Sequence, residues 1–119
     1  MAKRKYRRRL PVFFYSTETG SEPVRDWLRE LDAEDRRAIG IDLLRVQENW
    51  PLGMPVCRSL GKGFWEVRTR LRNNRTARVL FFVHEDRIGI AHGFIKKTRK
   101  TPETDLELAR KRMNEMKQS

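Results

Sequence analysis

Apolar and polar residues alternate through the middle of this chain, which is the pattern of β-strands. The runs 64–71 and 76–84 place apolar side chains at every second position along one face. Successive side chains of a strand point to opposite faces, so each run presents one apolar face and one polar face. The run 87–95 and the shorter segments 11–15 and 56–60 read as further strands.

Two earlier segments carry apolar residues at helical spacing instead. The two apolar stripes consist of Val24, Trp27, Leu28 and Leu31, and then of Ile39, Leu43, Val46 and Trp50. Ser21 and Asp32 can cap the two helices at their N-termini, and Pro51 ends the second helix. We expect a helical hairpin laid across a sheet, with Trp27 and Trp50 in the core.

A last helix is predicted from Pro102 onward, with Thr101 as its N-cap. Its apolar stripe consists of Leu106, Ala109, Met113 and Met116. The tight connections at 72–75 and 85–86 join three strands into an antiparallel meander. The order of elements predicts one α+β domain over residues 11–119, with an antiparallel-rich sheet. We expect the helical hairpin to cover one face of the sheet and the opposite face to stay partly open and cationic.

Charge narrows the range of partners. The 119 residues include 27 Lys and Arg against 16 Asp and Glu, a formal net charge of +11. Such a balance favours nucleic acid, an anionic membrane surface or an acidic protein as partner. No apolar run approaches the length of a membrane span, no secretory signal follows the basic start, and Cys57 is the single cysteine. We therefore expect a cytoplasmic protein without disulfides.

A basic arm over residues 1–10 precedes the first strand. Its cations are Lys3, Arg4, Lys5, Arg7, Arg8 and Arg9. A frayed, solvated terminus is the ordinary explanation of such a segment. The functional one is a tail that binds the phosphates of a nucleic acid and adds affinity without sequence choice. Both can hold at once.

The polar faces of the two central strands carry the candidate chemistry. Arg68 and Arg70 lie on one strand, and Arg78 shares a face with Phe82 on the next. Arginines beside an aromatic ring on a sheet can hold a phosphodiester backbone and stack a base. The alternative is a solvated outer face with ordinary surface charges. Repulsion between three neighbouring cations disfavours that alternative, so we expect an anionic partner here.

Two histidines, His84 and His92, raise the possibility of a two-histidine ribonuclease. His84 lies near the far end of its strand from Arg78, at the rim of the sheet. His92 lies on the same face of its strand as Phe94 and Lys96. A core position for His92 is as plausible as a contact with substrate. The sequence shows no His-Glu-x-x-His motif, no spaced carboxylate cluster and no Cys/His set. We expect neither a metal nor another cofactor.

Three motifs together resemble one family. They are Phe-Trp-Glu-Val-Arg at 64–68, Arg-Val-Leu-Phe-Phe at 78–82, and His-Gly-Phe-Ile-Lys-Lys-Thr at 92–98 followed by Lys-Thr-Pro at 100–102. In order and spacing they are similar to the phage-derived HigB-like branch of the RelE/ParE toxin superfamily. The resemblance extends from about Val12 through the last helix.

This resemblance implies a β-α-α-β-β-β core followed by a C-terminal helix. It also implies a ribosome-dependent endoribonuclease that cuts mRNA and is inhibited by a HigA-like helix-turn-helix antitoxin. The matching positions for catalysis are Arg68, Arg78, Lys96 and Lys97, and those for substrate binding are Arg70, Phe82, His92 and Phe94. Many relatives use a tyrosine near the C-terminus. None follows Thr101 here, so that role would pass to Phe94 or His92.

RNA cleavage needs no metal, because the 2′-hydroxyl is a nucleophile already present in the substrate. Arginines fixed on a strand can neutralise the phosphorane, and a lysine among other cations can exchange protons near neutral pH. Two other functions stay open. A ParE-like gyrase inhibitor has the same fold but no need to gather cations on one face. A non-catalytic basic module for RNA or DNA would also fit the composition.

Overall fold

Five strands form one sheet in the order β1-β5-β4-β3-β2. The computed structural model describes residues 9–96 and 100–118. The strands are β1 (Val12–Phe14), β2 (Cys57–Gly61), β3 (Phe64–Arg70), β4 (Thr76–His84) and β5 (Arg87–Lys96), and the helices are α1 (Pro23–Glu30), α2 (Ala33–Asn49) and α3 (Glu103–Gln118).

Strands β2 to β5 form an antiparallel meander, and β1 joins β5 in parallel. The predicted α+β class and antiparallel-rich sheet are confirmed. The element order is β-α-α-β-β-β-β-α, which has one strand more than the order that the resemblance implies. The additional strand is β2, close to the segment 56–60 that the sequence pattern indicates, and it pairs with β3.

Both tight hairpins contain left-handed residues. Asn73 and Asn74 join β3 to β4 with φ of 62° and 58°, and Glu85 and Asp86 join β4 to β5 with φ of 52° and 59°. Two consecutive residues of this conformation give a turn whose twist matches that of the strands. Asn and Asp tolerate it better than most residues, which is why the sequence predicts both connections.

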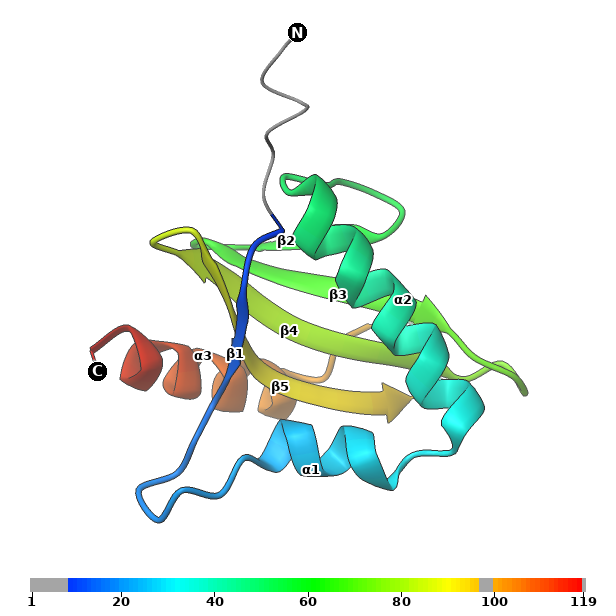
Figure 1. Cartoon of the computed structure of the whole chain (residues 1–119), viewed down its shortest axis with the longest axis horizontal. Helices are drawn as coiled ribbons and strands as arrows, with labels where there is room; N and C mark the ends of the chain where they lie inside the picture. The colour runs from blue at the N-terminus through cyan, green and yellow to red at the C-terminus, as the bar shows by residue number, and fades with distance from the viewer. Residues whose placement is uncertain (1–8, 97–99, 119) are drawn as a thin grey trace, which may run out of the picture.

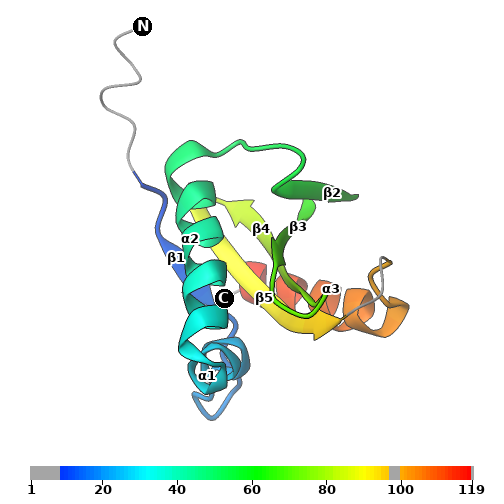
Figure 2. The ribbon, with the colours of Figure 1, turned by 90° about the vertical axis from the view of Figure 1, so that its right-hand side faces the viewer.

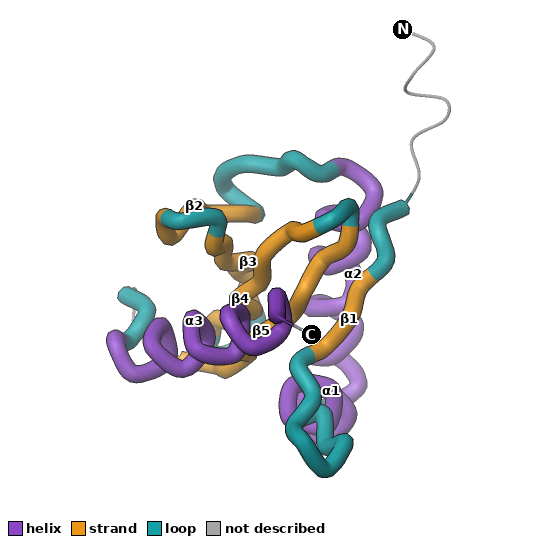
Figure 3. Tube along the Cα trace, turned by 90° about the vertical axis from the view of Figure 1, so that its left-hand side faces the viewer, coloured by secondary structure: helices purple, strands orange, loops and turns teal. Residues whose placement is uncertain are grey.

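The two faces of the sheet are covered by different helices. Helices α1 and α2 lie against one face, where the buried residues include Ile39, Val67 and Phe81. Helix α3 lies against the other face, where Leu80 and Phe82 are buried. Figures 1 and 2 show the sheet between these two layers, and Figure 3 shows β1 on the same side of the view as α1 and α2, with α3 on the other side.

The expectation of a partly open cationic face is therefore wrong for much of that face. The parity of the strands is as predicted, but Leu80 and Phe82 share the face of Arg78 and require cover. Helix α3 supplies that cover with Ala109, Met113 and Met116. Within the described residues, no helix has the length and apolarity needed to cross a membrane.

Trp27 and Trp50 fix the α1–α2 layer to the sheet, as predicted. Trp50 makes edge-to-face contacts with Trp65 and Phe81 at centroid distances of 5.0 and 5.5 Å. Trp27 packs on the backbone of β5 at Gly93. A Cβ at this position would lie 2.5 Å from Cζ3 and 2.9 Å from Cε3 of the indole. The glycine of the 92–98 motif is therefore needed for helix packing.

Substituting Gly93 with alanine should destabilise the fold by about 1–3 kcal/mol, the usual cost of overpacking a core. Gly40, inside α2, is the matched control, because a Cβ there meets no atom within 4 Å. Gly40→Ala should stabilise the fold by about 0.5–1 kcal/mol through helix propensity. Urea unfolding of the two variants tests this. A Gly93→Ala protein as stable as the parent would contradict the assigned Trp27 contact.

Candidate nucleic-acid interface

A cluster of buried polar side chains lies beneath the start of α3. Glu66 on β3 is 1% exposed, Arg78 on β4 is 0% exposed and Thr101 is 7% exposed. The Thr101 hydroxyl donates a hydrogen bond to Glu66 Oε1 and accepts one from Arg78 Nη1 at 3.1 Å. Thr101 thus bridges an anion and a cation that belong to different strands.

Arg68 extends this cluster toward solvent. It lies directly opposite Arg78 in the β3–β4 pairing, as the strand parity predicts. Its Nε is 3.6 Å from Glu66 Oε2, and its side chain is 26% exposed. One buried carboxylate therefore accompanies two arginines, which offsets the repulsion that two directly opposed cations would otherwise suffer.

The electrostatics of Arg78 reflect its burial. Loss of solvation lowers the pKa of Arg78, the Glu66 carboxylate opposes that change, and Arg68 and Arg58 lower the pKa further. Arginine has so high a pKa that it keeps its charge even so. The site therefore holds a fixed positive charge below the surface, with its negative partner beside it.

Three exposed cations surround the opening of this cluster. Arg58 on β2 lies opposite Glu66, Arg70 ends β3 opposite Thr76, and Lys96 ends β5 opposite the same Thr76. Directly opposed residues project from the same face of a sheet. We call Arg58, Arg68, Arg70 and Lys96 the arginine surface. It occupies the α3 side of the sheet, around the buried cluster of Glu66, Arg78 and Thr101.

His92 contacts the first turn of α3. Its Nε2 is 2.7 Å from Oδ1 of Asp105, in the first turn of the helix, and its side chain is 14% exposed. Phe94 is 8% exposed and lies against the His92 ring at a centroid distance of 5.4 Å. This pair anchors the start of α3 on β5, so neither ring offers an open platform for a base.

Phe82 lies deeper still, which corrects its expected role in base stacking. It is 0% exposed, makes an edge-to-face contact with Phe13 at 6.0 Å and has Lys117 of α3 over its ring. Phe82 is a core residue of the α3 layer. The expectation that Arg78 faces solvent is wrong for the same reason, because the chain that enters α3 passes over it.

The start of α3 also differs from its predicted cap. The helix begins at Glu103, and the Pro102 carbonyl accepts hydrogen bonds from the backbone N–H groups of Asp105 and Leu106. The Thr101 side chain is directed to Glu66 and Arg78 instead. The 92–102 segment therefore fastens the helix to the sheet through several separate contacts.

Part of the predicted site lies outside the described residues. This applies to Lys97 and to the arm residues Lys3, Arg4, Lys5, Arg7 and Arg8. Arg9 is described and pairs with Glu48 of α2 at 3.0 Å, with both side chains exposed. Of the other predicted site residues, Arg68, Arg70 and Lys96 come together on the arginine surface.

Sequence reasoning missed four residues of this region: Arg58, Glu66 as a buried counterion, Thr101 as a bridge, and Asp105. Arg58 could have been found by extending the strand-parity argument to β2. Glu66 is two residues from Arg68 on the same strand, so the two side chains lie on one face of the sheet. This spacing could have predicted a carboxylate beside Arg68. Thr101 and Asp105 have no local signal, because their partners are distant in sequence.

The cysteine lies on the face of the sheet opposite this site. Cys57 is buried against the α1–α2 layer, and loss of solvation followed by the charge of Asp42 raises its pKa to about 11. Among the described residues, no group of three or more His, Cys, Asp and Glu side chains is arranged to hold a metal ion.

Replacing Arg78 with methionine should destabilise the fold by about 3 kcal/mol, because Glu66 would stay buried without its main compensating charge. Thr101→Val keeps both charges and should cost less, about 1–2 kcal/mol for the missing hydrogen bonds. Denaturant unfolding of the single variants and the double variant tests whether the two effects are coupled. An Arg78→Met protein with parental stability would show that this charge pair is dispensable.

A comparison with known protein families gives a match over most of the chain. Residues 26–114 match the family described as phage-derived protein Gp49-like (DUF891), a range that includes all of β2 to β5 and ends within α3. No curated protein matches the chain. The matched range covers more than half of the sequence and contains both the arginine surface and the buried cluster. The chain belongs to the phage-derived Gp49-like family, which lies in the area of RelE-like and toxin–antitoxin proteins.

Proposed function

We propose that this protein is the toxin of a type II toxin–antitoxin system, a HigB-like endoribonuclease that cuts mRNA on the ribosome. In this proposal the reaction needs no metal, and a HigA-like helix-turn-helix antitoxin inhibits the toxin. Two observations support the proposal. The chain belongs to the Gp49-like family, and its sheet carries a cationic surface organised around one buried carboxylate.

The position of Arg68 is the observation that carries the proposal. Its Nε faces Glu66 while the side chain keeps partial access to solvent. A guanidinium held by a carboxylate on one side can present other N–H groups to a phosphate. Arg68 is thus the residue that would contact the scissile phosphate. A preorganised donor of this kind stabilises charge that develops in the transition state.

Arg78 has a different role in this proposal from the one expected from the sequence. A side chain with no exposed surface does not contact RNA in this arrangement. Arg78 acts as a positioning residue: with Thr101 it fixes Glu66, and Glu66 orients Arg68. The exposed cations Arg58, Arg70 and Lys96 would bind the flanking phosphates.

The proposed reaction is a transesterification. The 2′-oxygen attacks the adjacent phosphorus, the bond from phosphorus to the 5′-oxygen breaks, and a 2′,3′-cyclic phosphate remains. One proton leaves the 2′-hydroxyl and one is delivered to the departing 5′-oxygen. We assign delivery of the second proton to the ammonium group of Lys96, at the exposed end of β5, while the first proton leaves to solvent. His92 is less suited to these steps, because its side chain is only 14% exposed and lies against the start of α3.

Dependence on the ribosome follows from what the arginine surface offers. Its exposed members are cations on strand ends, and they bind phosphates without choosing a base. Cleavage requires the 2′-oxygen, the phosphorus and the 5′-oxygen to be in line, and such orientation is worth several orders of magnitude in rate. The decoding site of the ribosome holds mRNA in a fixed conformation and would supply that orientation.

Arg68→Ala should reduce mRNA cleavage by about 10²–10³-fold, the usual loss for one preorganised charge donor. Arg72→Ala is the matched control, because Arg72 is an exposed arginine just beyond β3 that pairs with Glu34 at 2.8 Å. Primer extension on mRNA from induced cells should show new 5′ ends within translated codons for the parent and the control. Thermal melting establishes that both variants fold.

Other outcomes would contradict the proposal. Gyrase-linked double-strand breaks with intact mRNA would indicate a ParE-like inhibitor. RNA binding without new 5′ ends, in a protein that arrests no growth, would indicate a non-catalytic module. Equal toxicity of the parent and the Arg68→Ala variant would remove Arg68 from the mechanism.

A further inference from the structure

Strand β1 has an open edge. It is the first strand in the sheet order and pairs only with β5 among the described strands. The Ile88 N–H donates to the Pro11 carbonyl, and the Tyr15 N–H donates to the Ile90 carbonyl. Hydrogen-bonding groups alternate between the two sides of a strand. Those of Val12 and Phe14 therefore point away from β5, toward the edge.

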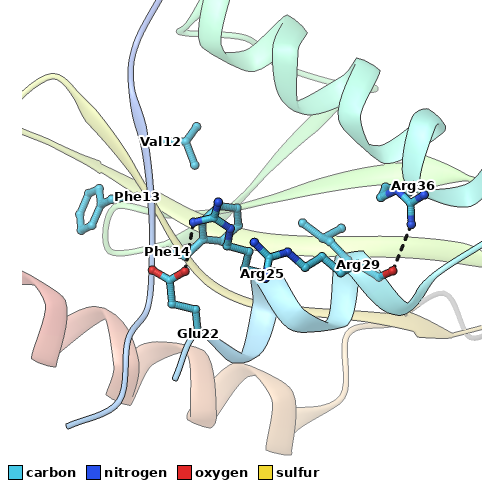
Figure 4. Close-up of a pocket in the computed structure, with 8 residues that line it drawn as sticks. Val12, Phe13, Phe14, Glu22, Arg25, Arg29 and Arg36 are labelled. Atoms are coloured by element: carbon cyan, nitrogen blue, oxygen red, sulfur yellow. Dashed lines mark hydrogen bonds and ion pairs between the residues drawn. The ribbon is translucent and has the colours of Figure 1, made fainter. Parts of the chain in front are cut away.

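A hollow of about 570 Å³ lies beside this edge. Val12, Phe14 and Leu28 contribute apolar surface to it, and Arg25, Arg29 and Arg36 contribute positive charge. Figure 4 shows Arg25 and Arg29 extending from α1 into the space between β1 and α2, with Phe13 pointing to the other side of β1. An apolar floor and a cationic rim thus lie against a row of backbone donors and acceptors.

Two of the three arginines of this hollow, Arg25 and Arg36, are held by hydrogen bonds. Arg36 donates from Nη1 to the carbonyls of Arg29 and Leu31, at 3.1 and 2.9 Å. Arg25 donates from Nη1 to Glu22 Oε1 at 3.2 Å, and both of these side chains are substantially exposed. Glu22, itself part of the lining, is the carboxylate that Arg25 contacts.

We propose that the β1 edge and this hollow bind an extended acidic segment of a partner protein, which adds to the sheet as a sixth strand. Main-chain hydrogen bonds to Val12 and Phe14 would give affinity, and side-chain contacts would give specificity. Acidic side chains on the inward face of the segment would pair with Arg25, Arg29 and Arg36. Apolar side chains on its other face would pack beside Phe13.

Charge decides between the possible occupants. The chain's own basic arm is repelled by three arginines, and so is a second copy of this +11 protein. A polynucleotide would satisfy the arginines but leave the backbone groups of Val12 and Phe14 without partners of matching spacing. An acidic peptide in extended conformation satisfies both.

This docking surface is separate from the arginine surface. It lies on the side of the sheet that α1 and α2 cover, whereas Arg68 and its neighbours lie on the α3 side. A partner bound at β1 would leave the arginine surface uncovered. The proposal does not depend on RNA cleavage and can be tested with the purified protein.

The test uses a blocked peptide of alternating Glu and Val, eight residues long, titrated into the full-length protein. Binding should be measurable by calorimetry and should slow hydrogen exchange at the Val12 and Phe14 amides. The Phe13 and Tyr15 amides face β5, so their exchange should change little. The double variant Arg25→Glu/Arg29→Glu should weaken binding about 100-fold, because each of the two removed arginines supplies a charge-assisted hydrogen bond worth about tenfold in affinity.

The matched control is Arg37→Glu/Lys111→Glu, which makes the same change in charge at exposed residues that do not line the hollow. It should bind the peptide within a few fold of the parent. The proposal is overturned if the control is weakened as much as the Arg25→Glu/Arg29→Glu variant, or if a Lys-Val peptide binds as well. It also fails if exchange at Val12 and Phe14 is unchanged on binding, or if oligouridylate displaces the peptide from this edge.

Discussion

The structure depends on how it accommodates a buried carboxylate and a buried guanidinium. Glu66 and Arg78 lie on adjacent strands with almost no exposed surface, and a single hydroxyl, that of Thr101, bonds to both. A lone charge in this position would be prohibitively costly, whereas a compensated pair with satisfied hydrogen bonds is tolerated. The arrangement determines where the chain enters α3, how far Arg68 reaches toward solvent, and which cations remain outside.

The segment from His92 to Pro102 shows how one motif serves both faces of a sheet. Gly93 admits the Trp27 ring on the α1 side, while its neighbour His92 pairs with Asp105 on the α3 side. Phe94 packs against His92, and Thr101 closes the buried cluster. Such a motif is specific as a sequence because each position meets a different steric or polar demand. Packing requirements therefore explain much of the 92–102 motif, one of the motifs on which the family resemblance rests.

Strand parity predicted that Arg68 and Arg78 share a face of the sheet, because successive side chains of a strand alternate between its two faces. Their direct pairing is set by the register of the β3–β4 hairpin. Strand parity also placed Leu80 and Phe82 correctly on the same face of the sheet as Arg78. The position of α3 could not be derived in this way, since its apolar stripe fits either side of a sheet. Arginine is rarely buried, so composition argued against the observed environment of Arg78. The roles of Thr101 and Asp105 depend on tertiary contacts, which produce no periodic pattern in the sequence.

The parallel pairing of β1 with β5 joins Val12 to Ile88, which are 76 residues apart in the sequence. Sheets closed by such distant pairings form slowly, because a long loop must be ordered before the two strands can meet. Thr101 and α3 lie still later in the sequence, so a nascent chain must extend well past β5 before the buried cluster can close. An incomplete chain, such as one cut short during synthesis, would lack both the bridge over Glu66 and the cover over Phe82. Assembly of the arginine surface thus depends on Thr101 and α3, which follow the sheet in the sequence.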